Sequence, residues 1–208
     1  RTSPFRPLPE VSRPLDAVRD HLRGHFAGTG IDAEPDSASV TFLGVEPMAV
    51  MRFGPDPEGI VSYVSVGCSR HPMTDAASSE ADPVRGPRAE IVLTLRGGTP
   101  TAGLARAMAV IAAAPAVEGV VLLPDALVDL SAPLWEAAAF TAVLLGESGI
   151  PDLALPAPLD PVRFLAAVPI TPTEAAWVRL KGAEAMRQAW LDDGVDVLDP
   201  NRRAARPC

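Results

Sequence analysis

The sequence contains few cysteines, few aromatic residues and almost no lysine. Two cysteines in 208 residues, Cys68 and Cys208, are too few for a disulfide framework, and a reduced, cytoplasmic protein is the simplest expectation. Aromatic residues make up 5% of the chain, too few to predict a base-stacking platform. The 18 Lys and Arg are outnumbered by 26 Asp and Glu, and the resulting net charge of −8 argues against general nucleic-acid binding. A charged partner is expected to be basic.

Long apolar runs are also missing. Uncharged stretches such as Ala107–Val117 are far shorter than the roughly 20 residues that a membrane-spanning helix needs, so no membrane association is predicted. The first 14 residues hold three Arg and four Pro without an apolar segment, which does not resemble a signal peptide. The chain has 23 prolines, and these exclude long uninterrupted helices.

Apolar periodicity predicts short strands and three helices. Leu15, Val18, Leu22 and Phe26 fall on one stripe of a helix that Gly28 ends. The segment Thr171-Pro-Thr-Glu174 is a capping-box pattern that starts a helix running to about Asp193. The remaining predicted elements are a helix over 101–114, stopped by Pro115, and strands over 40–45, 49–53, 60–66, 90–96, 119–123, 140–145 and 162–168.

These elements predict an α+β fold with a central mixed, largely antiparallel sheet flanked by helices. We expect residues 1–14 to form an extended or disordered arm and residues 15–198 to form one domain. Residues 199–208 carry Arg202, Arg203 and Arg206 and are expected to form a flexible basic tail. We expect the protein to be a monomer or a weak homo-oligomer, with a structural scaffold or oligomer subunit as an alternative role.

The polar loop over 67–87 is the most unusual segment, because structureless loops of this length are often functional or disordered. Cys68-Ser-Arg-His71 opens the loop, and a cysteine beside a histidine allows a hydrolase or transferase hypothesis. The other interpretation is a structural loop that ends a buried strand. Glu90 follows the loop at the head of a strand, where we expect it to pair with another residue or face solvent.

A metal site is a second chemical hypothesis. His21 and His25 are four residues apart on the first helix, and Cys68 and His71 have the spacing Cys-x-x-His. Such a site would use nearly every His and Cys in the chain, and the alternative is that these are ordinary helix and loop residues. Gly97-Gly98 lacks the Lys and Ser/Thr of a phosphate-binding loop. We therefore predict no metal, no cofactor and no catalytic residues.

Several segments resemble the suppressor-of-fused (SUFU) domain family in its compact bacterial form. They are the strand Tyr63-Val-Ser-Val-Gly-Cys-Ser69, the polar loop, and Arg88-Ala-Glu-Ile-Val-Leu-Thr-Leu95, followed by the downstream order that ends in Pro169-Ile-Thr-Pro-Thr-Glu174. The resemblance covers about residues 35–195. It implies an α+β fold and a non-enzymatic role in binding another protein. In this family the animal protein sequesters Gli transcription factors by strand addition, and bacterial relatives are considered immunity proteins that neutralise toxins.

The resemblance and the acidic charge together predict a protein-binding module, either an immunity protein facing a basic toxin or a regulatory sequestering protein. The alternative is the enzyme that would use the Cys68–His71 loop. We expect the partner to bind at a strand edge and loop within residues 65–90, because an unpaired edge can accept a strand. The predicted binding residues are Ser69, Arg70, His71, Arg88 and Glu90.

Overall fold

The structure is a computed structural model that describes residues 14–206, so most of the predicted arm and the terminal Cys208 lie outside the described residues. The first half contains α1 (Pro14–Gly28), β1 (Asp36–Val40), β2 (Met48–Phe53), β3 (Ile60–Val66), the short 3-10 helix η1 (Cys68–Arg70) and β4 (Arg88–Arg96). The second half contains α2 (Leu104–Glu118), β5 (Leu127–Asp129), β6 (Ala142–Glu147), β7 (Val162–Ile170), α3 (Pro172–Lys181) and α4 (Ala183–Asp192).

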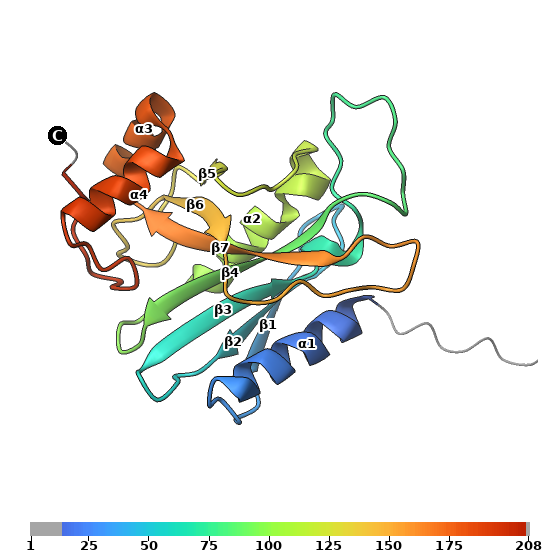
Figure 1. The fold of residues 1–208 in the computed structure, drawn as a ribbon, viewed down its shortest axis with the longest axis horizontal. Helices are drawn as coiled ribbons and strands as arrows, with labels where there is room; N and C mark the ends of the chain where they lie inside the picture. The colour runs from blue at the N-terminus through green and yellow to red at the C-terminus, as the bar shows by residue number, and fades with distance from the viewer. Residues whose placement is uncertain (1–13, 207–208) are drawn as a thin grey trace, which may run out of the picture.

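The strands form one seven-stranded sheet in the order β1-β2-β3-β4-β7-β6-β5 (Figure 1). Among the strands that the structure describes, only β4 and β7 pair in parallel, and every other pair is antiparallel. The two edges of the sheet are therefore β1 and β5. This arrangement confirms the predicted α+β fold with a mixed, largely antiparallel sheet.

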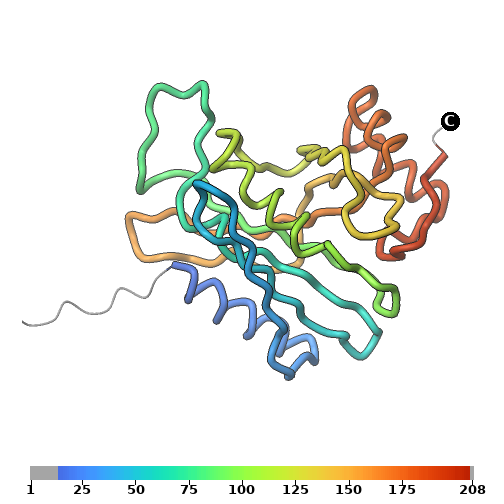
Figure 2. The backbone as a smooth tube through the Cα atoms, turned by 180° about the vertical axis from the view of Figure 1, so that it is seen from behind, coloured from blue at the N-terminus to red at the C-terminus, as the bar shows by residue number. Residues whose placement is uncertain are grey.

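Helices cover both faces of the sheet, and each face has its own buried side chains. Alternate β4 residues, among them Ile91 and Leu93, pack against α2. This is the face of the sheet that Figure 2 turns toward the viewer. Val92, which points to the opposite face, packs with α1 through Leu22 and Phe26. The pair α3–α4 covers the β6 side of that same face. Among the helices of residues 14–206, none covers the centre of this face, between α1 and α4.

Two of the three predicted helices differ from the observed ones. The predicted helix over 171–193 begins with a complete capping box between Thr171 and Glu174, but it breaks into α3 and α4 at Gly182. Gly182 has a φ of 92°, which a non-glycine residue rarely adopts, so the chain turns there. Pro115 does not stop α2, which continues to Glu118 and ends where the amide of Gly119 bonds the Pro115 carbonyl.

The predicted strands at 40–45 and 119–123 are misplaced. The first strand lies earlier, as β1, and residues 119–123 form no strand. The Gly119 carbonyl accepts a hydrogen bond from the Ala76 amide at 2.8 Å, and Leu122 is buried in the α2 core. This apolar run therefore pairs with a loop instead of a strand, and the short strand β5 follows it.

The C-terminal segment differs from the predicted flexible basic tail at Arg202. Its side chain is 4% exposed and forms an ion pair with Glu174 at 2.9 Å, where the carboxylate is completely buried. The indole of Trp190 also donates a hydrogen bond to Glu174, at 2.8 Å. Arg202 therefore fixes the segment around residues 202–205 against α3 and α4 instead of contributing to an exposed basic patch.

Candidate functional site

The carboxylate of Glu90 organises the turn between β3 and η1. One of its oxygens accepts hydrogen bonds from the backbone amides of Gly67 and Ser69, at 2.6 and 3.0 Å, and from the Ser69 hydroxyl at 3.1 Å. The other oxygen accepts from the Ser65 hydroxyl at 2.8 Å. The oxygen of Ser65 in turn accepts from the amide of Ile91 at 2.9 Å. This network holds the end of β3 against the start of β4.

Glu90 has no solvent exposure, which changes its acidity. Burial raises the pKa of its carboxyl to about 7, because the low-dielectric surroundings disfavour the charged form more than the hydrogen bonds favour it. Of the two expectations for Glu90, pairing with another residue is met by Ser65 and Ser69, and exposure to solvent is wrong. The alternating pattern of its strand could not distinguish a solvent-facing carboxylate from one that meets two amides of a folded-back turn.

The guanidinium of Arg88 joins the two ends of the long loop. It donates hydrogen bonds to the carbonyls of Ser69 and Arg70, at 2.9 and 3.0 Å, and to the carbonyl of Val84 at 3.2 Å. Arg88 is 3% exposed, and this burial lowers the pKa of its guanidinium. Residues 72–87 project from the end of the sheet as a loop, whose base Arg88 closes (Figure 1).

The side chains of Arg70 and His71 are directed toward Glu46, a residue in the turn between β1 and β2. The Arg70 Nε lies 2.7 Å from one carboxylate oxygen, and the His71 Nε2 lies 3.2 Å from the other. The side chains of Glu46 and His71 are 55% and 69% exposed, so this group is available to a partner. Glu46 did not stand out in the sequence, since it is one of many scattered carboxylates.

A hollow lies beside these three polar side chains, and we call it the Glu46–Arg70 pocket. Its volume is about 270 Å³, and apolar atoms of the β1–β2 turn and of α2 form much of its wall. The lining residues are Gly44, Val45, Glu46, Met48, Gly67, Cys68, Arg70, His71, Pro72, Thr74, Ala112, Pro115 and Ala116. A small apolar hollow with a polar rim has the general build of a protein interface.

The five predicted binding residues fall into two groups. Ser69, Arg88 and Glu90 are buried and bond to one another or to the loop, so they position the turn and are not accessible to a partner. Arg70 and His71 lie at the rim of the pocket. The predicted free strand edge within 65–90 was wrong, because β3 lies between β2 and β4, and β4 lies between β3 and β7.

The geometry of Cys68 does not support the enzyme hypothesis. Cys68 is 7% exposed, and burial, together with the nearby charge of Glu90, raises the pKa of its thiol well above the usual value. A nucleophilic cysteine needs the opposite shift, since the thiolate is the reactive form. The His71 side chain is largely exposed and contacts Glu46, so it does not act on a buried thiol.

Cys68 is therefore expected to react slowly with iodoacetamide in the native protein. In a Cys208→Ser background at pH 7.5, we expect alkylation to be about 100-fold slower or more than for an unperturbed thiol, because the thiolate is scarce and shielded. Mass spectrometry of timed samples gives the rate, and alkylation of the same variant in denaturant is the control. Alkylation as fast in the native as in the unfolded protein would contradict the buried, protonated thiol.

The residues of the metal hypothesis do not come together. His21 bonds the Pro151 carbonyl at 2.7 Å and stacks on Phe164, while His25 meets the edge of Phe26. Within residues 14–206, no three His, Cys, Asp or Glu side chains are placed to hold a metal ion. The same part of the chain has no helix long and apolar enough to cross a membrane.

Comparison with known families gives one match that covers most of the chain. The model of the suppressor of fused protein (SUFU) family matches residues 44–203. The chain belongs to the SUFU family. The matched region starts in the β1–β2 turn and includes Glu46, η1, the long loop and Glu90, so the whole candidate site lies within the SUFU match. A search of curated protein sequences gives no match.

Solved structures show the same fold at low sequence identity. A SUFU homologue from Neisseria gonorrhoeae FA 1090 is 21% identical with a TM-score of 0.60, and the alignment covers 91% of this chain and 95% of the homologue. A chain of the Sufu–Fu complex is 14% identical with a TM-score of 0.67, covering 94% and 93%. Drosophila Suppressor of Fused is 14% identical with a TM-score of 0.65, covering 93% of this chain and 51% of that protein.

Proposed function

We propose that this SUFU protein acts by binding another polypeptide without catalysing a reaction, as a regulatory sequestering protein or an immunity protein. Family membership carries the proposal, since the SUFU model matches residues 44–203 and a chain of similar fold was solved as part of a Sufu–Fu complex. The buried thiol of Cys68 is consistent with it. The enzyme alternative has no comparable observation in its favour.

The partner surface that we propose is the rim of the Glu46–Arg70 pocket. Arg70 and His71 share the carboxylate of Glu46, so each has a fixed position before a partner arrives. The buried residues Ser69, Arg88 and Glu90 hold the turn that carries them. Preorganised polar groups around an apolar hollow reduce the entropy that is lost on binding.

Replacing Arg70 and His71 together with alanine is expected to weaken partner binding at least about tenfold, which is the usual effect of losing anchoring side chains. The partner is first identified by co-purification and mass spectrometry, then purified and titrated by calorimetry. The melting temperature is expected to stay within about 2 °C, because both side chains are partly exposed and exposed ion pairs contribute little.

Arg179→Ala is the matched control for this experiment. Arg179 is also a partly exposed arginine with one carboxylate partner, Asp129 at 2.7 Å, and it lies on α3, away from the pocket. Its replacement is expected to leave the affinity unchanged. Equal affinity of the wild type and the Arg70/His71 variant for the purified partner would exclude this surface.

The acidic charge supports a basic partner, such as a cationic toxin for an immunity protein. With a net charge of −8, the protein attracts a cation over several ångströms, and salt screens that attraction. We expect the association rate constant to fall by about tenfold or more as salt is raised from low to high concentration, with a smaller change in the dissociation rate. Stopped-flow mixing measures both, and a salt-independent association rate would argue against a basic partner.

A further inference from the structure

Leu43, in the turn between β1 and β2, has a fully exposed side chain. The neighbouring side chains of Phe42 and Val45 are partly buried and pack against the α2 core, so they hold the turn in place. Gly44, the next residue, lines the Glu46–Arg70 pocket. Leu43 contributes little to the fold, and its apolar surface leaves water only when another molecule covers it.

The opposite wall of this pocket also borders an exposed apolar side chain. Ala112, Pro115 and Ala116 of α2 line that wall, and the next residue, Val117, is 62% exposed. The β1–β2 turn lies beside the C-terminal half of α2 (Figure 2). Each of these two elements therefore presents one exposed apolar side chain, and apolar groups gathered around a hollow are typical of interaction sites.

Two carboxylates lie at the rim where the long loop meets the end of α2. The Ala76 amide donates a hydrogen bond to the Gly119 carbonyl at 2.8 Å, so the residues before them, Asp75 and Glu118, lie at the same rim. Both are exposed, and Asp75 follows the lining residue Thr74. Within residues 14–206, neither forms an ion pair. This rim therefore offers two carboxylates to a basic side chain of a partner.

Nearby cations do not remove this negative charge. Each of three arginines has a carboxylate beside it: Arg70 has Glu46, Arg85 has Asp82, and the buried Arg88 has Asp160. His71 shares the Glu46 carboxylate with Arg70. Arg106 lies near the start of α2, about 15 Å from its last turn, which exceeds the screening length of about 8 Å at physiological salt. The rim therefore attracts a cation.

A partner contacts this pocket through side chains. Among the described strands only β2 contributes a lining residue, Met48, and β2 pairs with β1 and β3 on its two sides. An amphipathic helix presents apolar side chains along one face and basic side chains beside them, one turn away. That arrangement matches an apolar hollow with a pair of carboxylates at its rim.

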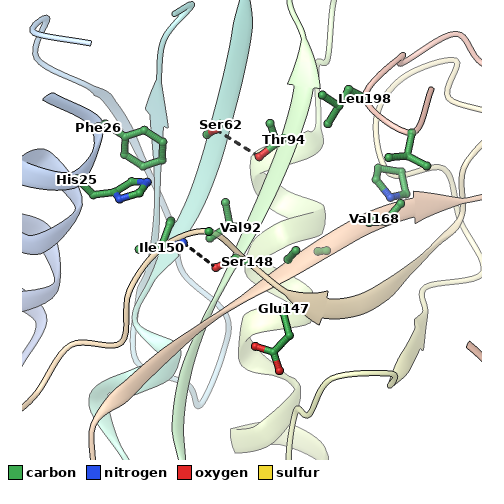
Figure 3. Close-up of a pocket in the computed structure, with 15 residues that line it drawn as sticks. His25, Phe26, Ser62, Val92, Thr94, Glu147, Ser148, Ile150, Val168 and Leu198 are labelled. Atoms are coloured by element: carbon green, nitrogen blue, oxygen red, sulfur yellow. Dashed lines mark hydrogen bonds between the residues drawn. The ribbon is translucent and has the colours of Figure 1, made fainter. Parts of the chain in front are cut away.

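Another hollow, of about 340 Å³, lies on the opposite face of the sheet, between α1 and α4 (Figure 3). It lies beside the end of the β4–β7 ladder, which Pro169 cannot continue because proline has no N–H. There the Leu198 carbonyl accepts a hydrogen bond from the Arg96 amide at 2.8 Å, and the Arg202 guanidinium donates to the Pro169 carbonyl at 2.9 Å. The opening in the sheet is therefore closed by the chain itself.

We propose that the Glu46–Arg70 pocket takes a basic amphipathic helix of the partner protein. One apolar side chain of this helix enters the pocket, its apolar neighbours cover Leu43 and Val117, and a Lys or Arg pairs with Asp75 and Glu118. This inference rests on the proposed function, because it uses the same pocket. It adds the class of partner that the pocket recognises.

Two designed helical peptides of about eighteen residues, or five turns, are the probes. Both carry leucine along one face, and the rest of the surface carries lysine in the Lys peptide and glutamate in the Glu peptide. Fluorescence anisotropy at about 0.15 M salt gives the dissociation constants. We expect the Lys peptide to bind at least about tenfold more tightly than the Glu peptide, and equal affinities would overturn the proposal.

Two variants test the apolar contacts. Leu43→Ser removes the exposed leucine and Ala116→Leu fills the pocket, and each is expected to weaken the Lys peptide at least about fivefold. The controls are Leu191→Ser, which removes a leucine 75% exposed on α4, and Ala166→Leu, which fills the hollow of Figure 3. Both controls are expected to bind like the wild type. A loss in Leu43→Ser no larger than in Leu191→Ser would overturn the proposal.

A pair of double variants tests the charged contacts. Asp75→Asn with Glu118→Gln is expected to weaken the Lys peptide at least about fivefold. Asp32→Asn with Glu136→Gln changes the net charge equally at exposed positions outside the pocket, and its effect is expected to stay below about twofold. Equal losses in the two double variants would show that net charge, and not this rim, attracts the peptide, and would overturn the proposal.

The natural partner separates this inference from the proposed function. We expect the Leu43→Ser and Asp75/Glu118 variants to weaken that partner as the Arg70/His71 variant does. If only the Arg70/His71 variant weakens it, the proposed function stands and the basic helix is overturned. If the Arg70/His71 variant leaves its affinity unchanged, the proposed surface is excluded and this inference is overturned with it.

Discussion

Replacing Glu174 with alanine is expected to lower the free energy of unfolding by about 3–5 kcal/mol, the cost of removing one partner of a buried ion pair. The Arg202 guanidinium would remain buried between Phe140 and Trp190, at 5.0 and 5.6 Å from their ring centres, without its counter-charge. The amides of Thr171 and Ala205 would also lose their acceptor. Urea unfolding followed by circular dichroism measures the change, and a melting temperature lower by on the order of 10 °C is expected with it.

Glu147→Ala is the matched control, because Glu147 also pairs with an arginine at 2.9 Å but its side chain is 76% exposed. Loss of that exposed pair is expected to lower the free energy of unfolding by less than about 1 kcal/mol. Replacing Glu174 and Arg202 together with methionine is expected to cost less than Glu174→Ala alone, since no unpaired charge stays buried. A cost for Glu174→Ala no larger than that for Glu147→Ala would contradict the buried pair.

The stability of the wild type is expected to fall between pH 5 and 8 because of Glu90. The pKa of this carboxyl is about 7 in the folded protein, against 4.5 for an exposed glutamate. A raised pKa in the folded state means that its contribution is complete below pH 4.5 and is lost as the pH rises through 7. The total change from this group is about 3 kcal/mol.

Glu90→Gln is expected to remove this pH dependence while keeping the turn intact. A glutamine oxygen can accept from the amides of Gly67 and Ser69, and its NH₂ group can donate to the hydroxyl oxygen of Ser65. The difference in unfolding free energy between variant and wild type, measured in urea from pH 5 to 8, isolates Glu90 from other titrating groups such as His25. We expect the variant to become more stable relative to the wild type as the pH rises. A difference in unfolding free energy that stays constant with pH would contradict the raised pKa of Glu90.

Strands and the first helix were predictable because their signals are local. The stripe through Val18, Leu22 and Phe26 gave α1, and the apolar runs gave β2, β3, β4 and β7 nearly as observed. Failures occurred where a distant contact decides the local structure. Residues 119–123 have the composition of a strand, but their backbone meets the loop at Ala76, and they pair with none of the strands within residues 14–206.

The candidate site was predictable as a segment but not as an arrangement. Composition and loop length pointed to residues 67–87, and Arg70 and His71 do lie at the rim of a pocket there. Glu46 and Ser65 were missed, because nothing in their own neighbourhoods in the sequence distinguishes them from other polar residues. Their roles depend on which side chain the fold brings within hydrogen-bond reach.

The sequence by itself determined the family, the α+β class, the acidic charge and most of the strands, since these depend on composition, periodicity and ordered motifs. Only the tertiary structure decided that Glu90 and Arg202 are buried, that β3 and β4 are interior strands, and that the sheet opens beside Pro169. The physical reason is that burial and strand order arise from pairings between residues far apart in the chain. A carboxylate or a proline has the same local pattern whether it faces water or the centre of a sheet.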